Sequence, residues 1–254
     1  MNKFIFDVDG TLTPSRQRMD SEFEKYFLEF CSNNDVYLVT GSDHPKTVEQ
    51  LGNDICLTVN RLYNCSGSDV WEGDTNTYTN NWHLPSDVRV WLETQLADSN
   101  FVLRTGNHIE ERPGMVNFSI VGRGATLGER AIYVKWDHNV GERSHICHLF
   151  NSRFKGIIAT AGGETGIDIS PTGADKRQIL KDFDTTDTLY FFGDSMESMG
   201  NDYLLAKAIV DKNMGSCYTV QDWQHTWKLL KDGESDRLRM QVHAPRSNTE
   251  EKTS

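Results

Sequence analysis

The feature that most constrains this chain is a short apolar strand that ends abruptly in two carboxylates. The run from Lys3 to Phe6 is followed by Asp7 and Asp9, with a single residue between them. An apolar run of this kind is typical of a parallel strand that helices cover on both faces. In such sheets, ligands bind beyond the carboxyl ends of the strands. The sequence therefore predicts an α/β protein with Asp7 and Asp9 at its functional site.

Two carboxylates so close together repel each other unless a positive charge lies between them. A Mg²⁺ ion, which takes oxygen ligands and retains bound water, would remove that repulsion. In this interpretation Asp7 is a candidate nucleophile and Asp9 a candidate general acid/base, both near the metal. An isolated Asp-x-Asp pair is more often a solvated turn or a helix cap. The interpretation therefore depends on the rest of the chain.

Composition limits the class of protein. The chain has 254 residues, enough for one large domain or two modest ones. Its net charge of −11 argues against non-specific nucleic-acid binding, which requires a basic surface. The sequence has no secretory signal and no apolar run that approaches a membrane span. The five cysteines are scattered without a Cys-x-x-Cys pair, so we expect reduced thiols in the cytoplasm and no zinc site.

A second strand, predicted at residues 36–39, brings hydroxyl groups to the same sheet edge. It ends in Thr40-Gly41-Ser42, and Asp43 is a candidate N-cap for a helix that runs to about Leu51. Hydroxyls and backbone N–H groups at the start of a helix form a good phosphate site. A preceding helix is predicted from the capping box Ser21-x-x-Glu24 through Cys31.

The middle of the chain shows a different pattern. Residues 60–80 predict a hairpin or loop with its tip near Glu72-Gly73-Asp74, and a helix capped by Ser86 follows. The alternation of apolar and polar residues over Met115 to Val121 predicts an antiparallel strand with one polar face. Further strands are predicted at 101–104 and 167–169, with a helix over 144–154 between them. We expect residues 82–172 to form an α+β cap that is inserted into a core of residues 1–81 and 173–243, with a disordered tail at 244–254.

The doubly wound pattern then resumes. Asp175-Lys176 opens a helix, and an apolar strand at 188–192 ends in Gly193-Asp194. The loop after it contains Asn201 and Asp202, and a last strand at 208–210 and a helix around 223–230 close the chain. Three strand ends thus converge with Lys176 nearby. Such a set fits phosphoryl transfer through an aspartyl intermediate, with Asp194 as a metal ligand and with Lys176, Thr40 and Ser42 neutralising the transferred group.

The chain resembles the haloacid dehalogenase (HAD) superfamily, whose motifs match Asp7-Val8-Asp9-Gly10-Thr11, Thr40, Lys176 and Gly193-Asp194 with Asn201-Asp202. Within that superfamily it resembles the eukaryotic-type phosphomannomutases. The matching segments are Phe6 to Thr13 with Arg16-Gln17, Gly41-Ser42-Asp43, Glu49 to Gly52, Glu110-x-Arg112 through Arg123, Gly162-Gly163, and Asp175-Lys176. The resemblance covers most of residues 3–230.

The resemblance implies a Mg²⁺-dependent phosphotransferase that interconverts mannose 1-phosphate and mannose 6-phosphate, on the route to GDP-mannose, through phosphorylated Asp7. It implies that the metal is held by Asp7, Asp9, Asp194, Asn201 and Asp202. It assigns the sugar phosphate to Arg16, Thr40, Ser42, Arg104, Arg112, Asn117, Arg123 and Asp168, with Lys176 as a catalytic residue. It also implies priming by a hexose 1,6-bisphosphate and a homodimer formed through the cap.

Three different functions stay open at this stage. The first is a sugar-phosphate phosphatase, in which water would attack the aspartyl-phosphate. Thr40 replaces the glycine usual in those mutases and resembles such phosphatases, and Gly166 stands where the mutases usually have serine. The second is a metal-dependent glycosyltransferase that uses Asp7 and Asp9, and the third is a non-catalytic binding protein. Separately, His145-x-x-His148 beside Cys147 is a weak metal-site candidate because it lacks a clear carboxylate partner.

Overall fold

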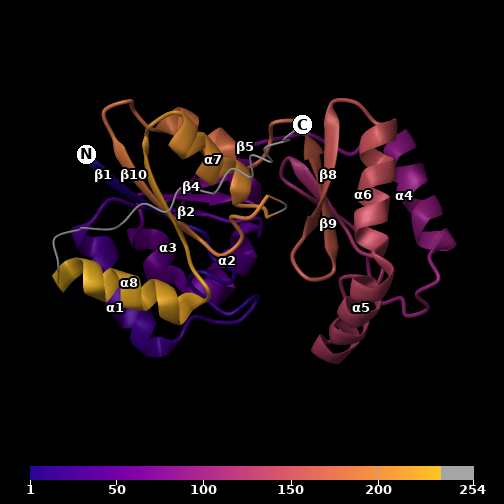
Figure 1. Ribbon diagram of the computed structural model, residues 1–254, viewed down its shortest axis with the longest axis horizontal. Helices are drawn as coiled ribbons and strands as arrows, with labels where there is room; N and C mark the ends of the chain where they lie inside the picture. The colour runs from indigo at the N-terminus through magenta and orange to yellow at the C-terminus, as the bar shows by residue number, and fades with distance from the viewer. Residues whose placement is uncertain (199, 236–254) are drawn as a thin grey trace, which may run out of the picture.

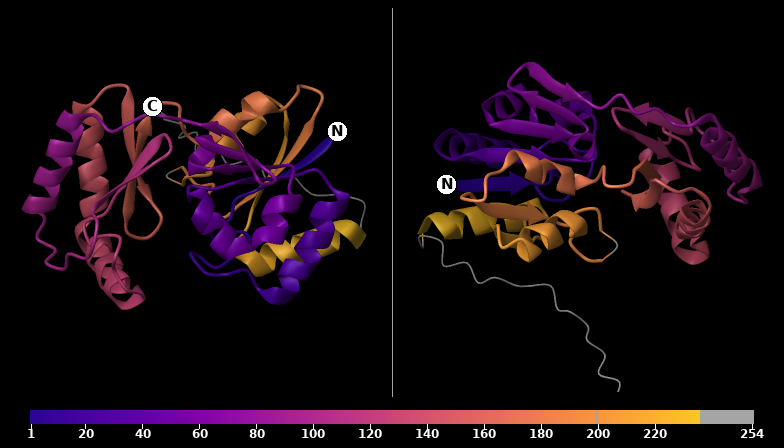
Figure 2. Two further views of the ribbon diagram at one scale, coloured as in Figure 1. Left: turned by 180° about the vertical axis from the view of Figure 1, so that it is seen from behind. Right: turned by 90° about the horizontal axis from the view of Figure 1, so that it is seen from above.

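The protein consists of two lobes, each with its own sheet (Figure 1). The computed structural model describes residues 1–198 and 200–235. One lobe, the core, contains a seven-stranded sheet in the order β11-β10-β1-β2-β3-β4-β5, and the other, the cap, contains a four-stranded sheet in the order β6-β7-β9-β8. The lobes lie side by side in the views from behind and from above (Figure 2). The domain boundaries after residues 81 and 172 stay a prediction, and the tail at 244–254 lies outside the described residues.

The core sheet places β1 in its interior. The parallel strands are β1 (Asn2–Phe6), β2 (Val36–Val39), β3 (Arg61–Asn64), β10 (Thr188–Gly193) and β11 (Gly215–Thr219). The antiparallel strands β4 (Asp69–Glu72) and β5 (Thr75–Thr79) form the predicted hairpin at one edge. Because β1 pairs with both β10 and β2, the ends of these three strands meet at the site of Asp7.

Helices cover both faces of the core sheet, as the sequence predicted. They are α1 (Ser21–Asn33), α2 (His44–Leu51), α3 (Asn53–Thr58), α7 (Tyr203–Asp211), α8 (Trp223–Ser235) and the 3₁₀ helices η1 (Cys65–Gly67) and η2 (Lys176–Asp182). On β1, Phe4 and Phe6 pack in one apolar cluster with α1, whereas Ile5 packs in another with η2 and α7. The strand is therefore buried on both faces, which explains its continuous apolar run.

The cap is an antiparallel sheet with helices on one face. Its elements are α4 (Ser86–Asp98), β6 (Ile109–Arg112), β7 (Met115–Phe118), α5 (Leu127–Val140), α6 (Glu142–Arg153), β8 (Ile157–Gly162) and β9 (Gly166–Pro171). Val116, Phe118 and Ile169 belong to the apolar cluster of the cap. The alternate residues Asn117 and Asp168 line the pocket toward the core. The predicted polar face of this sheet is therefore the face that meets the core (Figure 1).

Some local predictions were wrong. Residues 208–210 belong to α7, where Leu205 and Ile209 are buried one turn apart, and the last strand is β11. Residues 101–104 form no strand, because the Arg104 guanidinium turns back and donates to the carbonyl groups of Phe101 and Leu103. The cap of α1 is the Asp20 side chain rather than the predicted capping box.

Other elements were missed by the sequence patterns. Helix α5 has buried residues Arg130, Tyr133 and Asp137, so its inward face is largely polar and gives no apolar periodicity. Strand β8 starts with two isoleucines but continues with small residues and threonine, and α3 begins directly after Gly52, the residue that caps the end of α2. All the described cysteines are free thiols, as expected. Within the described residues, no helix is long and apolar enough to cross a membrane.

Gly122 is predicted to be essential for the folding of the cap. Its φ is +89°, and a Cβ atom there would lie 1.9 Å from the carbonyl oxygen of Thr105. Gly122→Ala should lower the free energy of unfolding by about 2 kcal/mol or more, since it combines a left-handed conformation with a backbone clash. The matched control is Gly128→Ala in α5, where a Cβ meets nothing within 4 Å and helix propensity predicts a gain of up to about 1 kcal/mol. Equal urea midpoints for the two variants would contradict this account.

Candidate active site

The centre of the site is a buried cluster of one ammonium and two carboxylates. Asp7 directly follows β1, and Lys176 opens η2 after Asp175 caps it by accepting from the Arg177 N–H. The Lys176 Nζ lies 2.5 Å from Asp7 Oδ1 and 2.7 Å from Asp202 Oδ1. The lysine is 1% exposed, Asp7 3% and Asp202 0%. Lys176 and Asp202 therefore lie behind Asp7, as supports for its carboxylate.

Burial and charge shift the protonation equilibria of this cluster. Burial raises the pKa of Asp7 well above its usual range, the carboxylates of Asp202 and Asp194 raise it further, and Lys176 opposes them. Burial alone would lower the pKa of Lys176, but Asp202 and Asp7 outweigh it and raise the pKa above its usual value. The ammonium therefore stays charged, and the site still carries an excess of negative charge.

That excess is consistent with a divalent cation. Carboxylate oxygens of Asp7, Asp194 and Asp202 lie within 4.8 Å of one another, the single such group of His, Cys, Asp or Glu side chains among the described residues. Asp194 follows β10, and burial together with Asp202 raises the pKa of Asp194 to about 6. A Cβ on Gly10 would lie 2.3 Å from Asp194 Oδ2, so only glycine leaves this carboxylate its place.

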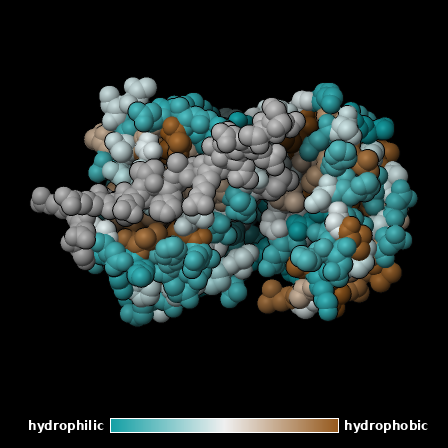
Figure 3. Space-filling model, viewed as in Figure 1, coloured by the Kyte–Doolittle hydropathy of each residue, from teal (hydrophilic) through white to brown (hydrophobic). Residues whose placement is uncertain are grey.

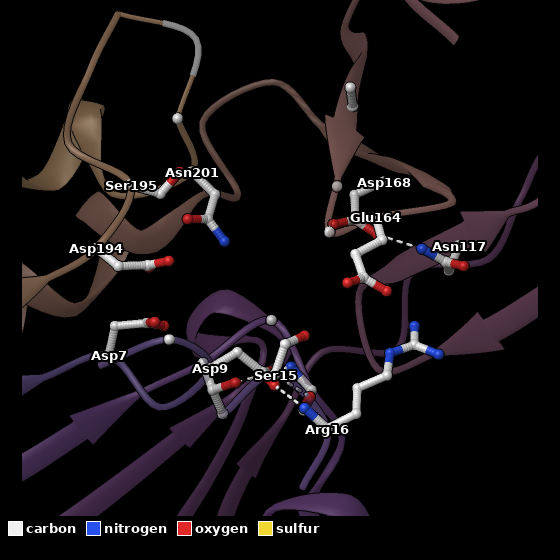
Figure 4. A pocket seen from close by; sticks show the side chains of 18 of the residues that line it. Asp7, Asp9, Ser15, Arg16, Asn117, Glu164, Asp168, Asp194, Ser195 and Asn201 are labelled. Atoms are coloured by element: carbon white, nitrogen blue, oxygen red, sulfur yellow. Dashed lines mark hydrogen bonds between the residues drawn. The ribbon is translucent and has the colours of Figure 1, made fainter. Parts of the chain in front are cut away.

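The five predicted metal ligands differ in how they are placed. Asp7 and Asp194 lie next to each other and both point into the pocket, as does the Asn201 amide (Figure 4). Asp202 is already bonded to Lys176 and to the Ser195 N–H at 3.2 Å, so its position suits support rather than direct coordination. Asp9 lies outside the group of three carboxylates. The His145, Cys147 and His148 cluster also lies outside that group.

Asp9 is held by neutral donors. Its Oδ1 accepts from the Arg16 N–H at 2.8 Å and from Gln50 Nε2 at 2.9 Å, and its Oδ2 lies 3.4 Å from Ser42 Oγ. Both Asp9 and Arg16 line the pocket (Figure 4). A carboxylate held in this way can exchange a proton with a group bound beside Asp7.

Hydrogen bonds to its three carbonyl groups fix the conformation of the loop Thr40-Gly41-Ser42, which follows β2. The Thr40 carbonyl accepts from the Ser66 N–H at 2.8 Å and the Ser42 carbonyl from the Cys65 N–H at 2.9 Å. The Gly41 carbonyl accepts from Arg112 Nη1 of the cap at 3.2 Å. These hydrogen bonds occupy all three carbonyl groups, which favours an anion at this edge. The donors Cys65 and Ser66 have φ of 47° and 57°, a strained conformation that persists beside functional sites.

The pocket lies between the lobes and has a volume of about 400 Å³. The core contributes Asp7, Asp9, Thr40 and Ser42, while the cap contributes Arg112, Asn117, Glu164 and Asp168 (Figure 4). Asn117 donates to Asp168 Oδ1 at 2.6 Å across β7 and β9. The site is therefore complete only when both lobes are present.

The cap contains a cluster of arginines, of which Arg112 lines the pocket, whereas the sequence-predicted Arg123 and the neighbouring Arg130 do not. Arg112 and Arg123 both pair with Glu110, and Arg130 pairs with Glu164 at 3.3 Å. Arg123 Nη1 and Arg130 Nε are buried without a hydrogen-bond partner among the described residues. Burial and the charge of Arg112 lower the pKa of Arg123. A cluster that repels further positive charge and has spare donors is suited to bind an anion such as phosphate.

Several pocket residues were not predicted from the sequence. They are Ser15, Lys46, Glu164 and Glu197, together with Gln50 and Arg130, which contact pocket residues. Lys46 could have been noticed as a cation three residues after Asp43, and Arg130 as a cation directly after the capping box of α5. The structure does not bring Arg104 to this pocket. Its guanidinium donates to carbonyl groups at the end of α4 and in the segment after it.

The fold and this set of residues define an HAD-type protein. Solved structures with the same fold include a trehalose-6-phosphate phosphatase related protein, with a TM-score of 0.57 and 19% identity over 92% of this chain and 97% of the other. A haloacid dehalogenase-like hydrolase from Bacteroides thetaiotaomicron gives a TM-score of 0.54 and 14% identity over 91% of this chain and 99% of the other. At these identities the likeness concerns the fold alone.

The sequence comparisons identify the family within that class. The family model for eukaryotic phosphomannomutase matches residues 23–232, and the chain belongs to this family. Similar relatives include human Phosphomannomutase 1, 32% identical over 78% of this chain and 80% of the relative. A phosphomannomutase of Oryza sativa subsp. indica is 30% identical over 86% of this chain and 90% of the relative. The family and the HAD fold leave the glycosyltransferase and the non-catalytic binding protein without support.

Mg²⁺ should stabilise the protein in a pH-dependent manner. The pKa of Asp194 is raised to about 6, so its ionisation between about pH 4 and pH 6 destabilises the fold, and a cation would reverse that effect. At pH 5 the cation must also displace a proton. We expect 10 mM Mg²⁺ to raise the melting temperature by about 2–4 °C at pH 7.5 and by clearly less at pH 5.

The control for this prediction is a second carboxylate variant. Asp194→Asn should abolish the Mg²⁺-induced shift, whereas Asp211→Asn should keep it, since Asp211 pairs with Lys207 on the surface. Equal shifts at both pH values, or a full shift in Asp194→Asn, would argue against this site.

Proposed function

We propose that the protein is a phosphomannomutase, which moves a phosphoryl group between the 1- and 6-oxygens of a hexose through phosphorylated Asp7. The observation that carries this proposal is the pairing of two anion sites across one pocket. The carboxylates and the Thr40-Gly41-Ser42 loop lie on the core side, and Arg112, which shares Glu110 with Arg123, lies on the cap side. A mutase must hold both phosphates of a bisphosphate, and this arrangement offers a place for each.

The chemistry follows from the positions of the residues. Asp7 Oδ2 attacks the phosphorus, because Lys176 donates to the other carboxylate oxygen, Oδ1. Asp9 protonates the leaving sugar oxygen and later takes a proton from the accepting hydroxyl. The Gly41 N–H and the hydroxyl of Ser42 stabilise the transferred group, because the N–H groups of Thr40 and Ser42 donate within the protein. A Mg²⁺ ion held by Asp7, Asp194 and Asn201 would supply charge neutralisation to the phosphoryl oxygens.

The cap completes the reaction by holding the second phosphate. Arg112, Arg123 and Arg130 bind the phosphate that is not being transferred, and Arg16 contacts it from the core. Burial and the positive charges of Arg123 and Arg130 lower the pKa of Arg16, an effect that a bound phosphate would offset. The bisphosphate must reorient in the pocket before the second transfer, so a closed cap keeps it from escaping and excludes water. Priming by a hexose 1,6-bisphosphate is part of this proposal.

Thr40 and Gly166 favoured a phosphatase in the sequence, but their contacts in the structure weaken that interpretation. The Thr40 hydroxyl accepts from the Ser42 N–H at 3.0 Å, so the threonine has a role within the loop while its O–H can still donate to a phosphate. At Gly166, a Cβ would lie 2.4 Å from Asn117 Nδ2, so a larger residue there would have to displace Asn117. Both positions thus have local explanations that do not require water as the phosphoryl acceptor.

We also propose that the protein is a homodimer and that it acts in the cytoplasm. Apolar side chains are exposed along the edge of the cap that α5 forms (Figure 3), including Leu127, Ile132 and Val140. This supports a homodimer through the cap, because a second copy would remove these groups from water. The free cysteines support a reducing compartment such as the cytoplasm.

The product distribution tests the proposed function. The purified protein is mixed with mannose 1-phosphate, Mg²⁺ and a trace of glucose 1,6-bisphosphate, and both mannose 6-phosphate and free phosphate are measured. We expect mannose 6-phosphate with little free phosphate. Free phosphate as the main product would replace the mutase with a phosphatase, and neither product would mean that mannose 1-phosphate is not the substrate.

The arginine cluster should matter most for the bisphosphate. Arg123→Gln removes a cation of the cap arginine cluster, so we expect the half-saturating concentration of glucose 1,6-bisphosphate to rise about 10–100-fold, as charge-assisted contacts to phosphate predict. Arg153→Gln is the matched control, because Arg153 lies at the end of α6 over the Phe154 ring. Equal activation curves for the two variants would contradict a phosphate site on the cap.

A further inference from the structure

Gln50, near the end of α2, contacts the proposed acid/base although it does not line the pocket. Its Nε2 donates to Asp9 Oδ1 at 2.9 Å and to Thr13 Oγ1 at 3.2 Å, and the residue is 2% exposed. Its backbone carbonyl accepts from the Met19 N–H at 2.8 Å. Gln50 therefore connects α2 to the beginning and the end of the loop that carries Asp9.

The two oxygens of Asp9 have different surroundings. Oδ1 receives two N–H donors, from Gln50 and from the main chain of Arg16 at 2.8 Å. Arg16 adopts φ of 58°, which is uncommon for a residue with a side chain, so the loop keeps a strained conformation at the residue whose N–H contacts Oδ1. The contact made by Oδ2 is the Ser42 hydroxyl at 3.4 Å. Oδ2 is therefore the oxygen left available to a bound substrate.

The orientation of the Gln50 amide is set by the carboxylate. Turning the amide over would place Oε1 against Asp9 Oδ1, and two acceptors would then face each other. In the orientation found, Oε1 is buried without a hydrogen-bond partner among the described residues. An unpaired buried acceptor lowers stability. Stability alone therefore does not explain a glutamine at this position. Its amide instead serves to hold the Asp9 carboxylate.

We propose that Gln50 is a positioning residue for Asp9, which together with the Arg16 N–H fixes Oδ1 so that Oδ2 faces the reacting sugar oxygen. During transfer to Asp7, the Oδ2–H bond breaks and an O–H bond forms on the leaving sugar oxygen, while that oxygen loses phosphorus to an Asp7 carboxylate oxygen. In the return step, Oδ2 takes the proton of the hydroxyl that accepts the phosphoryl group. This inference rests on the proposed function only for the identity of the leaving group.

The test separates positioning from folding by changing the leaving group. Phenolate is a poor leaving group that benefits from protonation, whereas 4-nitrophenolate leaves without it. Phenol and 4-nitrophenolate release are measured in the first turnover of phenyl phosphate and 4-nitrophenyl phosphate. The variant is Gln50→Met, which keeps the length of the side chain and removes the donor. We expect phenol release to fall about 10–100-fold, as misplacement of a catalytic group predicts, and 4-nitrophenolate release to change by less than about threefold.

The control variant is Gln178→Met. The Gln178 amide donates to the Ser66 carbonyl at 2.7 Å, so the variant removes a comparable glutamine contact away from Asp9. It should leave the ratio of the two rates unchanged. A parallel fall in both rates for Gln50→Met would reduce Gln50 to a structural residue, and no fall in either would exclude the positioning role.

Turnover of mannose 1-phosphate by Gln50→Met and by the unsubstituted protein is measured beside the aryl phosphates. Positioning predicts a fall of about 10–100-fold in kcat with KM nearly constant. If the unsubstituted protein itself fails to turn over mannose 1-phosphate, the proposed substrate is wrong. The ratio of the two aryl phosphate rates then still decides the role of Gln50.

Discussion

A buried ammonium connects the parts of this active site. Lys176 lies between Asp7 and Asp202 and is almost completely buried. Two carboxylates buried without it would be strongly destabilising, because charges in the interior must be paired. Asp202 in turn accepts from the Ser195 N–H, which fixes the loop after β10 that begins at Asp194. The ion pairs of Lys176 with Asp7 and Asp202 therefore fix the ends of β1 and β10 relative to the start of η2.

The second constraint is that the site is divided between two lobes. Arg112 of the cap donates to the Gly41 carbonyl of the core. The N–H groups of Cys65 and Ser66 donate to the other two carbonyls of the same loop. The cap thus orders part of the proposed phosphate loop as well as carrying the distal arginines. Glu110 and Glu164 pair with those arginines, so an incoming phosphate would compete with two carboxylates for the same donors. Cap position and anion binding are linked through these contacts.

Much of the core could be predicted because its patterns are local. The run of β1 is apolar because both faces are buried, and Asp43 caps α2 as its spacing predicted. The cap was harder, since α5 faces inward with Arg130 and Asp137 and so lacks an apolar stripe. At the site, Asp7, Asp9 and Asp194 follow strands and could be found, whereas Gln50 and Arg130 act from helices at a distance in the sequence. Arg104 matched a motif, yet its guanidinium is used by local carbonyl groups, which no motif could reveal.

The central claim is that Asp7 becomes phosphorylated, and mass spectrometry can test it directly. The protein is mixed with glucose 1,6-bisphosphate labelled with ¹⁸O in its phosphoryl groups, quenched in acid within the first turnover, digested and analysed. The account predicts a labelled acyl phosphate on the peptide that contains Asp7, and its loss in Asp7→Asn. A labelled phosphoryl group on another residue, or turnover with no phosphorylated peptide at any quench time, would contradict it.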